Sequence, residues 1–537
     1  MINAAEVSRV ISLDFRLPYP SSRSPVLGRN IVSTSQPLAA QAGLSMLLQG
    51  GNAIDAAIAA AMALTVVEPT GCGLGSDAFA IVWDGNKLHG LNSSGRSPRG
   101  WTPERFKGLA AMPERGWESV TIPGAVAAWA ELSKRFGTLP LPVLAEPAVR
   151  YARFGFLVSP KIAALWEIES RLHAKQPGYA TYFMPGGRAP RPGEEFKCPD
   201  LAQSLELIAE TKGEAFYRGV LGERLAAFAQ NHGAALNEED LAAHSADWVE
   251  PISMSFEGYL VQELPPNCQG IATLMALGII DALGERGSGP DDPAVIHIAI
   301  EAMKLAFADL HRYAADPGAM AVTPAALLDK AYLASRAELI DRNRAGTPTF
   351  GAPKPGGTVY VATADQDGRM VSFIQSNYMA FGSGVVAPGA ISLQNRGAGF
   401  VLEPGHANQV GPRKRPLHTI IPGFVTEQSG APLMAFGVMG GFIQAQGHLQ
   451  MALRILRYGQ NPQAAADAPR WRVLSGRSVA VEASMDSTII DGLRARGHEI
   501  QTGLPVQQFG GAQIILRTES GYVAGSDPRK DGQAVAF

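Results

Sequence analysis

The spacing of apolar residues predicts helices along the first two thirds of the chain. Apolar side chains recur at helical intervals over 37–48, and the glycines at 50 and 51 should end that helix. Asn52 is expected to cap the next helix, over 53–64, which is apolar on nearly every side and should therefore be buried. Further helices are predicted over 124–136, 201–210, 220–230, 294–313 and 325–343.

The pattern changes to strands after residue 357. Residues 358–364 alternate and are rich in β-branched side chains, the Asp-Gly pair at 367–368 is a hairpin signal, and residues 370–376 return as a second strand. A helix is expected over 444–458. Other strands are predicted over 78–83, 390–394, 433–438, 479–482 and 512–517. Helices on both sides of a strand-rich centre indicate a sheet packed on a sheet, with helices outside.

A segment rich in proline and glycine separates the two parts. It reads AGTPTFGAPKPGG over 345–357 and contains three prolines and four glycines. Such a composition is typical of an exposed, flexible segment at which a chain can be cut. The residue that follows it, Thr358, is the first residue of the predicted strand.

Composition and charge exclude several classes of function. The 537 residues carry a formal net charge of −3, which gives no support for a nucleic-acid or membrane-surface partner. Three scattered cysteines and ten scattered histidines, without an HExxH motif, predict neither a disulfide framework nor a metal site. Arg9, Asp14 and Arg16 interrupt the N-terminal apolar runs, and the longest apolar run, 56–67, is too short to cross a bilayer, so a cytoplasmic protein is expected.

Thr358 has the setting that an N-terminal nucleophile needs. A threonine hydroxyl is a weak nucleophile unless a base takes its proton, and a free α-amino group with a pKa of ~8 can act as that base. The amine becomes free only if the bond between Gly357 and Thr358 is broken. The glycines at 356 and 357 would allow the strained backbone that an N-to-O acyl shift requires. Taken alone, the same pattern also fits an ordinary strand that follows a glycine-rich loop.

Motifs along nearly the whole chain match those of one enzyme family in order and spacing. They are STSQPLAAQAGLSMLLQGGNAIDAAIAAAMALTVVEPTGCGLG, TVYVATADQDGRMVSFIQSN, FGSG, VGPRKRPLHTIIPGF, GVMGG and GSDPRKDG. On these motifs the chain resembles the gamma-glutamyltranspeptidase family of N-terminal-nucleophile hydrolases. The resemblance implies an α+β fold, a four-layer αββα sandwich. It also implies a precursor that splits itself into residues 1–357 and 358–537, which stay together in one core.

The resemblance also implies a mechanism without a cofactor. Thr358 takes the place of the nucleophile, which attacks an amide and forms an acyl-enzyme that water or an amine then resolves. Ser376 matches a family threonine that hydrogen-bonds the nucleophile. Gly440 and Gly441 match the pair whose backbone N–H groups form the oxyanion hole, and each such donor is worth roughly 3 kcal/mol.

Positions that match the family's substrate-binding residues carry other side chains here. The family's acidic residue, which holds a substrate α-amino group, is replaced by Gly399, and a nearby glutamine by Arg396. The carboxylate-binding arginine is replaced by Ser94, with Arg96 two residues later. Without the acidic residue at 399, and with the planar guanidinium of Arg396, the pocket favours an amide that carries a carboxylate over a free γ-glutamyl amino acid. The predicted substrate-binding residues are Arg396, Tyr378, His418, Thr419 and Arg96.

Each of these residues also has a plain structural explanation. Arg396 and Arg96 would then be exposed loop residues, His418 a hydrogen-bonded core histidine, and Tyr378 a packing residue of a strand. The glycine pair at 440–441 would be a tight turn after a strand. Only their occurrence together with the matching motifs favours the functional interpretation.

Three functions follow from this pattern. The first is a self-processing amidohydrolase acting on a small carboxylate-bearing amide, oxamate-like or an acyl amide. QNRG at 394–397 supports it, since it is more similar to the acylase and oxamate-hydrolase branches of the family. The second is a true γ-glutamyltransferase or glutathione hydrolase with a rebuilt pocket, and the third an unprocessed, non-catalytic binding protein. The expected partners are a small-molecule amide and the two processed subunits themselves, with a homodimer as a further option.

Overall fold

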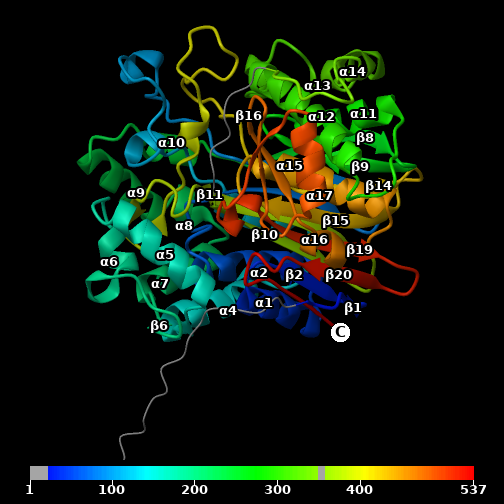
Figure 1. Ribbon diagram of the computed structural model, residues 1–537. Helices are drawn as coiled ribbons and strands as arrows, with labels where there is room; N and C mark the ends of the chain where they lie inside the picture. The colour runs from blue at the N-terminus through cyan, green and yellow to red at the C-terminus, as the bar shows by residue number, and fades with distance from the viewer. Residues whose placement is uncertain (1–21, 349–356) are drawn as a thin grey trace, which may run out of the picture.

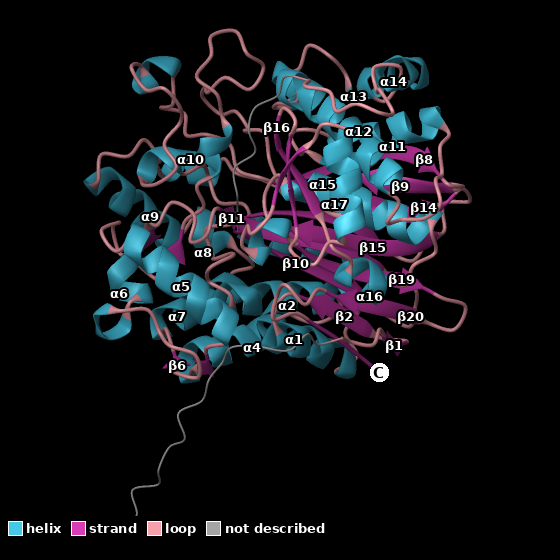
Figure 2. Cartoon of the chain, in the orientation of Figure 1, coloured by secondary structure: helices cyan, strands magenta, loops and turns pink. Residues whose placement is uncertain are grey.

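The computed structural model describes residues 22–348 and 357–537, in which two seven-stranded antiparallel sheets pack face to face (Figures 1 and 2). The first sheet has the order β21 (Gln533–Ala536), β2 (Ile31–Thr34), β10 (Gly357–Ala364), β11 (Met370–Tyr378), β3 (Asp77–Trp83), β4 (Leu88–Ser93) and β7 (Asp247–Val249). The second has the order β1 (Val26–Gly28), β20 (Tyr522–Ser526), β19 (Gly511–Arg517), β15 (Pro432–Met439), β14 (Gly423–Glu427), β9 (Tyr259–Glu263) and β8 (Ile252–Phe256).

Strand β10 lies at the centre of the sandwich, between β2 and β11, and packs on β15 and β19 of the other sheet. Its residues alternate between two faces: Val359 and Val361 pack toward the outer helices, and Tyr360 packs between the sheets. A side chain at Gly437 would lie 2.3 Å from the Tyr360 ring, so glycine there lets the sheets approach. The alternation turns Thr358 toward the second sheet.

Helices cover the outer faces of both sheets. Helices α1 (Pro37–Leu48) and α2 (Ala53–Val67) pack on the first sheet. Helices α11 (Gly270–Leu283), α15 (Ile443–Ala452) and α16 (Pro462–Asp467) pack on the second (Figure 2). The predicted four-layer αββα sandwich is therefore confirmed.

The cap of α2 also follows the sequence prediction. The Asn52 side chain accepts the backbone N–H groups of Ile54 and Asp55, and the Asp55 carboxylate accepts that of Asn52. Every residue of α2 is buried, as expected for a helix that is apolar on nearly every side.

Most other predicted elements occur within a few residues of their expected bounds. The remaining helices of eight or more residues are α3 (Ala125–Phe136), α4 (Leu141–Phe154), α5 (Pro160–His173), α7 (Pro199–Glu210), α9 (Val220–Asn231), α12 (Pro293–Tyr313), α14 (Lys330–Ala337) and α17 (Ser487–Ala495). The shorter ones are α6 (Tyr179–Phe183), α8 (Glu214–Tyr217), α10 (Glu238–Ala242) and α13 (Pro324–Leu327). Small sheets contain β5 (Phe156–Leu157) with β6 (Glu195–Phe196), β12 (Val386–Ala387) with β13 (Ile391–Ser392), and β16 (Trp471–Ser475), β17 (Ser478–Val481) and β18 (Glu499–Gln501).

Three predicted elements differ from the structure. The single helix expected over 325–343 is wrong: α13 ends at Leu327, and the Asp329 side chain caps a new helix, α14, by accepting the N–H of Tyr332. The strand expected over 390–394 is reduced to β13, which pairs only with β12. The helix expected over 444–458 is α-helical only to Ala452 and continues as a π-turn over Leu453–Arg457.

Residues before and after position 357 alternate within both sheets. In the first sheet, β2 and β3 come from the earlier stretch and flank β10 and β11 of the later stretch. In the second sheet, β9 and β8 from the earlier stretch extend β14 and β15. Within the described residues, no helix combines the length and the apolar character needed to cross a membrane.

Candidate active site

Thr358 lies at an irregularity near the start of β10. Between Gly357 and Val359 the pairing advances by two residues on β10 and by three on β11, so the extra residue of this bulge belongs to β11, opposite Thr358. The Thr358 side chain is buried, and its Oγ1 lies 3.2 Å from Oγ of Ser376 on β11. The Nε2 group of Gln444 donates to the same Thr358 oxygen over 3.3 Å. The threonine hydroxyl therefore contacts Ser376 of the first sheet and Gln444 of α15, a helix that packs on the second sheet.

Two glycines form the turn between β15 and α15, beside this hydroxyl. Gly440 and Gly441 have φ angles of 122° and 76°, which only glycine adopts readily. The Gly441 carbonyl accepts hydrogen bonds from the Gln269 side chain, over 3.0 Å, and from the Gln444 backbone. Since Gln444 also contacts Thr358, the turn and the nucleophile candidate are connected through one residue. The turn precedes the N-terminus of a helix, where backbone N–H groups attract negative charge.

Replacing Gly440 by alanine should slow catalysis with little effect on substrate affinity. The new Cβ would lie 2.7 Å from Ile443 Cγ2, and alanine is strained at φ 122°, so the turn must shift. We expect kcat to fall by about 10²-fold with KM nearly unchanged, because the oxyanion donor predicted for this turn would act mainly in the transition state. Steady-state kinetics on the correctly processed protein measures this. Gly430→Ala is the control, since Gly430 has a φ of +89° but open space around it.

Arg396 is completely buried, so the alternative that it is an exposed loop residue is wrong. Its Nη1 donates to Thr419 Oγ1 over 2.8 Å, and its guanidinium carbon lies 4.4 Å from the centroid of the Tyr378 ring. Its Nε is 3.9 Å from an oxygen of Asp77. Within the described part of the chain, Nε and Nη2 have no hydrogen-bond partner. Unused N–H groups on a buried guanidinium are costly, and a carboxylate is the acceptor that fits them best.

Asp77, at the start of β3, balances the charge of Arg396. It accepts the N–H of Gly95 over 3.0 Å, and the Nε2 of His418 lies 3.1 Å from its Oδ2. Burial raises the pKa of Asp77 to about 7, although Arg396 opposes this shift, and burial lowers the pKa of Arg396 to about 10. Burial holds the pKa of His418 well below its usual range. The His418 ring is therefore neutral, and since its Nδ1 accepts from the Ile420 backbone, its Nε2–H donates to Asp77.

The side chain of Gln269 bridges the residues around Arg396 and the Gly440–Gly441 turn. Gln269 donates both to the Thr419 carbonyl and to the Gly441 carbonyl. Thr419 in turn accepts from Arg396. Arg396 and the Gly440–Gly441 turn are therefore linked through Thr419 and Gln269.

Tyr378 connects the residues around Arg396 to Thr358. It pairs with Gly357 in the ladder between β10 and β11, and its backbone N–H donates to Ser376 Oγ over 2.7 Å. Its φ of 79° is unusual for a bulky residue, and strained backbone of this kind is often retained at functional sites. The strain places the Tyr378 ring against Arg396.

Arg96 is not brought into this cluster. Its guanidinium pairs with Asp316 at 3.1 Å and lies 3.8 Å from Asp247, and the side chain is 43% exposed. Its predicted role in substrate binding stays a prediction, as do the roles of the other predicted site residues. Of the segment predicted to be cut, residues 349–356 lie outside the described residues.

Three side chains of this site were not predicted from the sequence. Asp77 follows the glycine-rich GCGLGS segment, and its position between a tight turn and a buried strand was a usable signal. Gln269 and Gln444 stand in no motif, and only the packing of α11 and α15 brings them to Thr358 and the glycine turn.

Comparison with known proteins gives a consistent assignment. The family model described as gamma-glutamyltranspeptidase matches residues 39–537. A glutathione hydrolase-like YwrD proenzyme of Bacillus subtilis is 37% identical, over 96% of this chain and 100% of its own length. An oxamate amidohydrolase proenzyme of Klebsiella pneumoniae is 35% identical, over 93% of this chain and 97% of its own length. The crystal structure of a cephalosporin acylase from Bacillus halodurans superimposes with a TM-score of 0.94 at 49% identity, covering 98% of this chain and 99% of that one.

Proposed function

The chain belongs to the gamma-glutamyltranspeptidase family and is an N-terminal-nucleophile hydrolase, and we propose that it cuts itself before Thr358 and uses that threonine to cleave a carboxylate-bearing amide. The observation that carries the proposal is the buried Thr358 hydroxyl, 3.2 Å from Ser376 and linked through Gln444 to the two-glycine turn. Family membership favours an enzyme over the alternative of a non-catalytic binding protein.

The proposed reaction needs only groups of the chain. The freed α-amino group of Thr358 takes the hydroxyl proton while Oγ1 attacks the amide carbonyl carbon. The carbonyl oxygen becomes negative and is stabilised by the backbone N–H groups of the Gly440–Gly441 turn. The amine leaves with the proton, which gives an ester on Thr358. Water then attacks this ester, releases the carboxylic acid and restores the hydroxyl.

The proposed substrate class follows from the positive charge of Arg396. The Nε and Nη2 groups of Arg396 are buried and have no hydrogen-bond partner within the described residues, so a substrate carboxylate would satisfy both. Oxamate, named in the Klebsiella relative, has an amide directly beside a carboxylate. Position 399 is unsuited to an acidic side chain, because a Cβ on Gly399 would lie 2.7 Å from the Leu417 carbonyl oxygen.

A glutathione hydrolase or γ-glutamyltransferase is the second candidate, since the Bacillus subtilis relative is named glutathione hydrolase-like. A panel of amides separates the two. Hydrolysis of oxamate-like or acyl amides, monitored as released ammonia or amine, supports the first proposal. Rapid release from a γ-glutamyl anilide, stimulated by a dipeptide acceptor, would replace it with the second.

The affinity for carboxylates should weaken as the pH rises through about 7. Below this pH Asp77 is protonated and Arg396 keeps an unbalanced positive charge; above it the ionised Asp77 neutralises that charge. The inhibition constant of a product carboxylic acid should therefore increase from pH 6 to pH 8, by up to about tenfold for each unit by which the bound carboxylate raises the pKa of Asp77. Asp77→Asn should remove this dependence. An inhibition constant that is flat in the unmodified enzyme would contradict the assigned pairing.

We also propose that the fragments 1–357 and 358–537 remain associated after the cut, because both stretches contribute neighbouring strands to both sheets. Co-elution of two fragments on size exclusion would support this association. The same column gives the number of copies, which decides on the predicted homodimer.

A further inference from the structure

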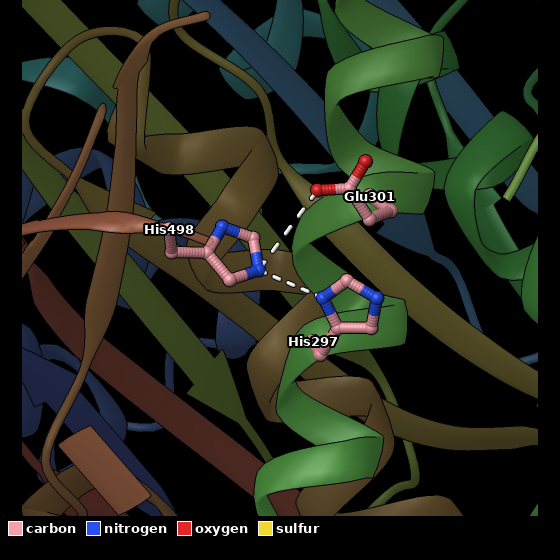
Figure 3. A group of neighbouring side chains, drawn as sticks. All are labelled: His297, Glu301 and His498. Carbon is pink, nitrogen blue, oxygen red and sulfur yellow. Dashed lines mark hydrogen bonds and ion pairs between the residues drawn. The ribbon is translucent and has the colours of Figure 1, made fainter. Parts of the chain in front are cut away.

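Two histidines and a glutamate meet in a buried cluster between α12 and the loop that precedes β18. His297 and Glu301 lie one turn apart on α12, and both face His498, which lies between α17 and β18 (Figure 3). All three residues are buried, and their ligand atoms lie within 4.8 Å of one another. Among the described residues, this is the group whose donor atoms could hold a metal ion.

The three facing atoms lie close enough together to become ligands of one small cation. His297 Nδ1 lies 2.7 Å from His498 Nε2, and His498 Nε2 lies 3.9 Å from Glu301 Oε1. Two nitrogens bound to one tetrahedral zinc at 2.0–2.1 Å lie about 3.3 Å apart, so the two imidazoles must separate by about 0.6 Å to admit the ion. Two imidazoles and one carboxylate are also a ligand set that zinc uses.

The hydrogen bonds around the cluster orient these atoms. His297 Nε2 lies 2.8 Å from the Asp341 carbonyl oxygen and must donate to it, so Nδ1 carries the lone pair that faces the centre. The Nδ1 of His498 has no hydrogen-bond partner in the described part of the chain. Because His297 Nδ1 accepts, the facing Nε2 of His498 donates to it, and the nitrogen left without a partner within the described residues is Nδ1, on the other side of the His498 ring.

From this geometry we propose that His297, Glu301 and His498 bind one zinc-class divalent cation. No sequence motif indicates this site, because His498 lies far along the chain from the other two residues. His297 and Glu301 precede the proposed cut and His498 follows it, so the ion would join the two fragments. The ion would also fasten residues 341–346, since Asp341 contacts His297 and the Gly346 N–H donates to Glu301 over 2.9 Å.

Lys304 competes with the cation. Its ammonium donates to Glu301 Oε1 over 2.7 Å and to the Gly346 carbonyl over 3.2 Å, so a positive charge already neutralises the carboxylate. A second cation at Glu301 is repelled by it. Lys304→Met should therefore strengthen metal binding by about tenfold, a gain that a purely structural cluster would not produce.

The test is metal content and affinity of the full-length protein, measured by plasma mass spectrometry and by competition with a fluorescent chelator. We expect about one zinc per chain in the wild type and at least a tenfold loss of affinity in His498→Gln and Glu301→Gln. His173→Gln is the matched control, because His173 and Glu169 on α5 have the same spacing but form only a pair. Magnesium, which prefers oxygen ligands, should not compete.

X-ray absorption of the zinc-loaded protein should show nitrogen and oxygen neighbours at about 2.0–2.1 Å, with the signature of two imidazoles. Near-ultraviolet circular dichroism checks that each variant is folded. Zinc bound equally well by the folded His297→Gln/His498→Gln double variant would overturn the proposal, as would zinc at the same trace level in the wild type and His498→Gln.

The bridging role rests on the proposed cut and is tested separately. In urea, the two fragments of the wild type should separate at a higher concentration with zinc than with chelator, and His498→Gln should show no such difference. The uncut Thr358→Ala chain should still bind zinc. If processing fails but zinc binds, the site stands without the bridge; if processing occurs and zinc is absent, only the site is refuted.

Discussion

Thr358→Ala should yield a single uncut chain of 537 residues that does not hydrolyse amides. Alanine keeps the strand but removes the oxygen that lies 3.2 Å from Ser376 and accepts from Gln444. The same oxygen is required twice, for the acyl shift that cuts the chain and for attack on the substrate. We therefore expect at least about a 10⁴-fold loss of kcat/KM, together with complete loss of processing.

Mass spectrometry and N-terminal sequencing measure the processing directly. In the wild type the smaller fragment should begin Thr-Val-Tyr-Val. Thr358→Ser is the matched control, because it keeps the hydroxyl and should still cut and turn over. Full activity in an uncut protein, or unchanged activity in Thr358→Ala, would show that another residue is the nucleophile.

Arg396→Met should remove selectivity for carboxylate-bearing amides while preserving amide cleavage itself. Methionine fills much of the space beneath the Tyr378 ring but offers no N–H group and no charge. Losing a buried, charge-assisted contact costs about 2–4 kcal/mol, so kcat/KM for a carboxylate-bearing amide should fall by about 30- to 10³-fold. A neutral amide of the same size should change by less than about threefold. The ratio of the two rates is the measured quantity.

Removing Arg396 also leaves Asp77 without its cation, and a folding defect must be separated from lost binding. The double variant Arg396→Met/Asp77→Asn removes both charges and should fold at least as well as the single variant. Arg396→Lys keeps a point charge without the planar fork and should recover only part of the selectivity. If kcat/KM fell equally for both amides in all three variants, Arg396 would support the structure and would not bind the substrate carboxylate.

The sequence was informative for several features that depend on neighbouring residues. The cap at Asn52, the buried helix α2 and the hairpin of β10 and β11 depend on neighbouring residues, and all three occur as predicted. The strand expected over 390–394 failed because its apolar residues are buried by surrounding loops rather than by a long ladder. The spacing of apolar residues indicates which side chains are buried, but burial alone does not decide how many residues form a β-ladder.

The candidate site was predicted only in part, for a related reason. Arg396 and the glycine pair stand in recognisable motifs, whereas Gln269, the residue before α11, reaches them from a different region of the chain. Asp77 is adjacent to Arg396 only because β3 and the 394–397 loop meet through a bridge between Gly75 and Leu393. Such contacts depend on tertiary packing, which no window of sequence contains.

The alternation of the two stretches within both sheets has a consequence for the life of the molecule. An intact precursor can reach its native state by a unimolecular reaction, whereas a cut protein that has unfolded must bring two chains together and interleave their strands again. Recovery after denaturation should then depend on protein concentration and compete with aggregation. After a cut at Thr358, the persistence of the folded enzyme would therefore depend on how slowly its fragments separate, which is kinetic stability, and no longer on reversible folding.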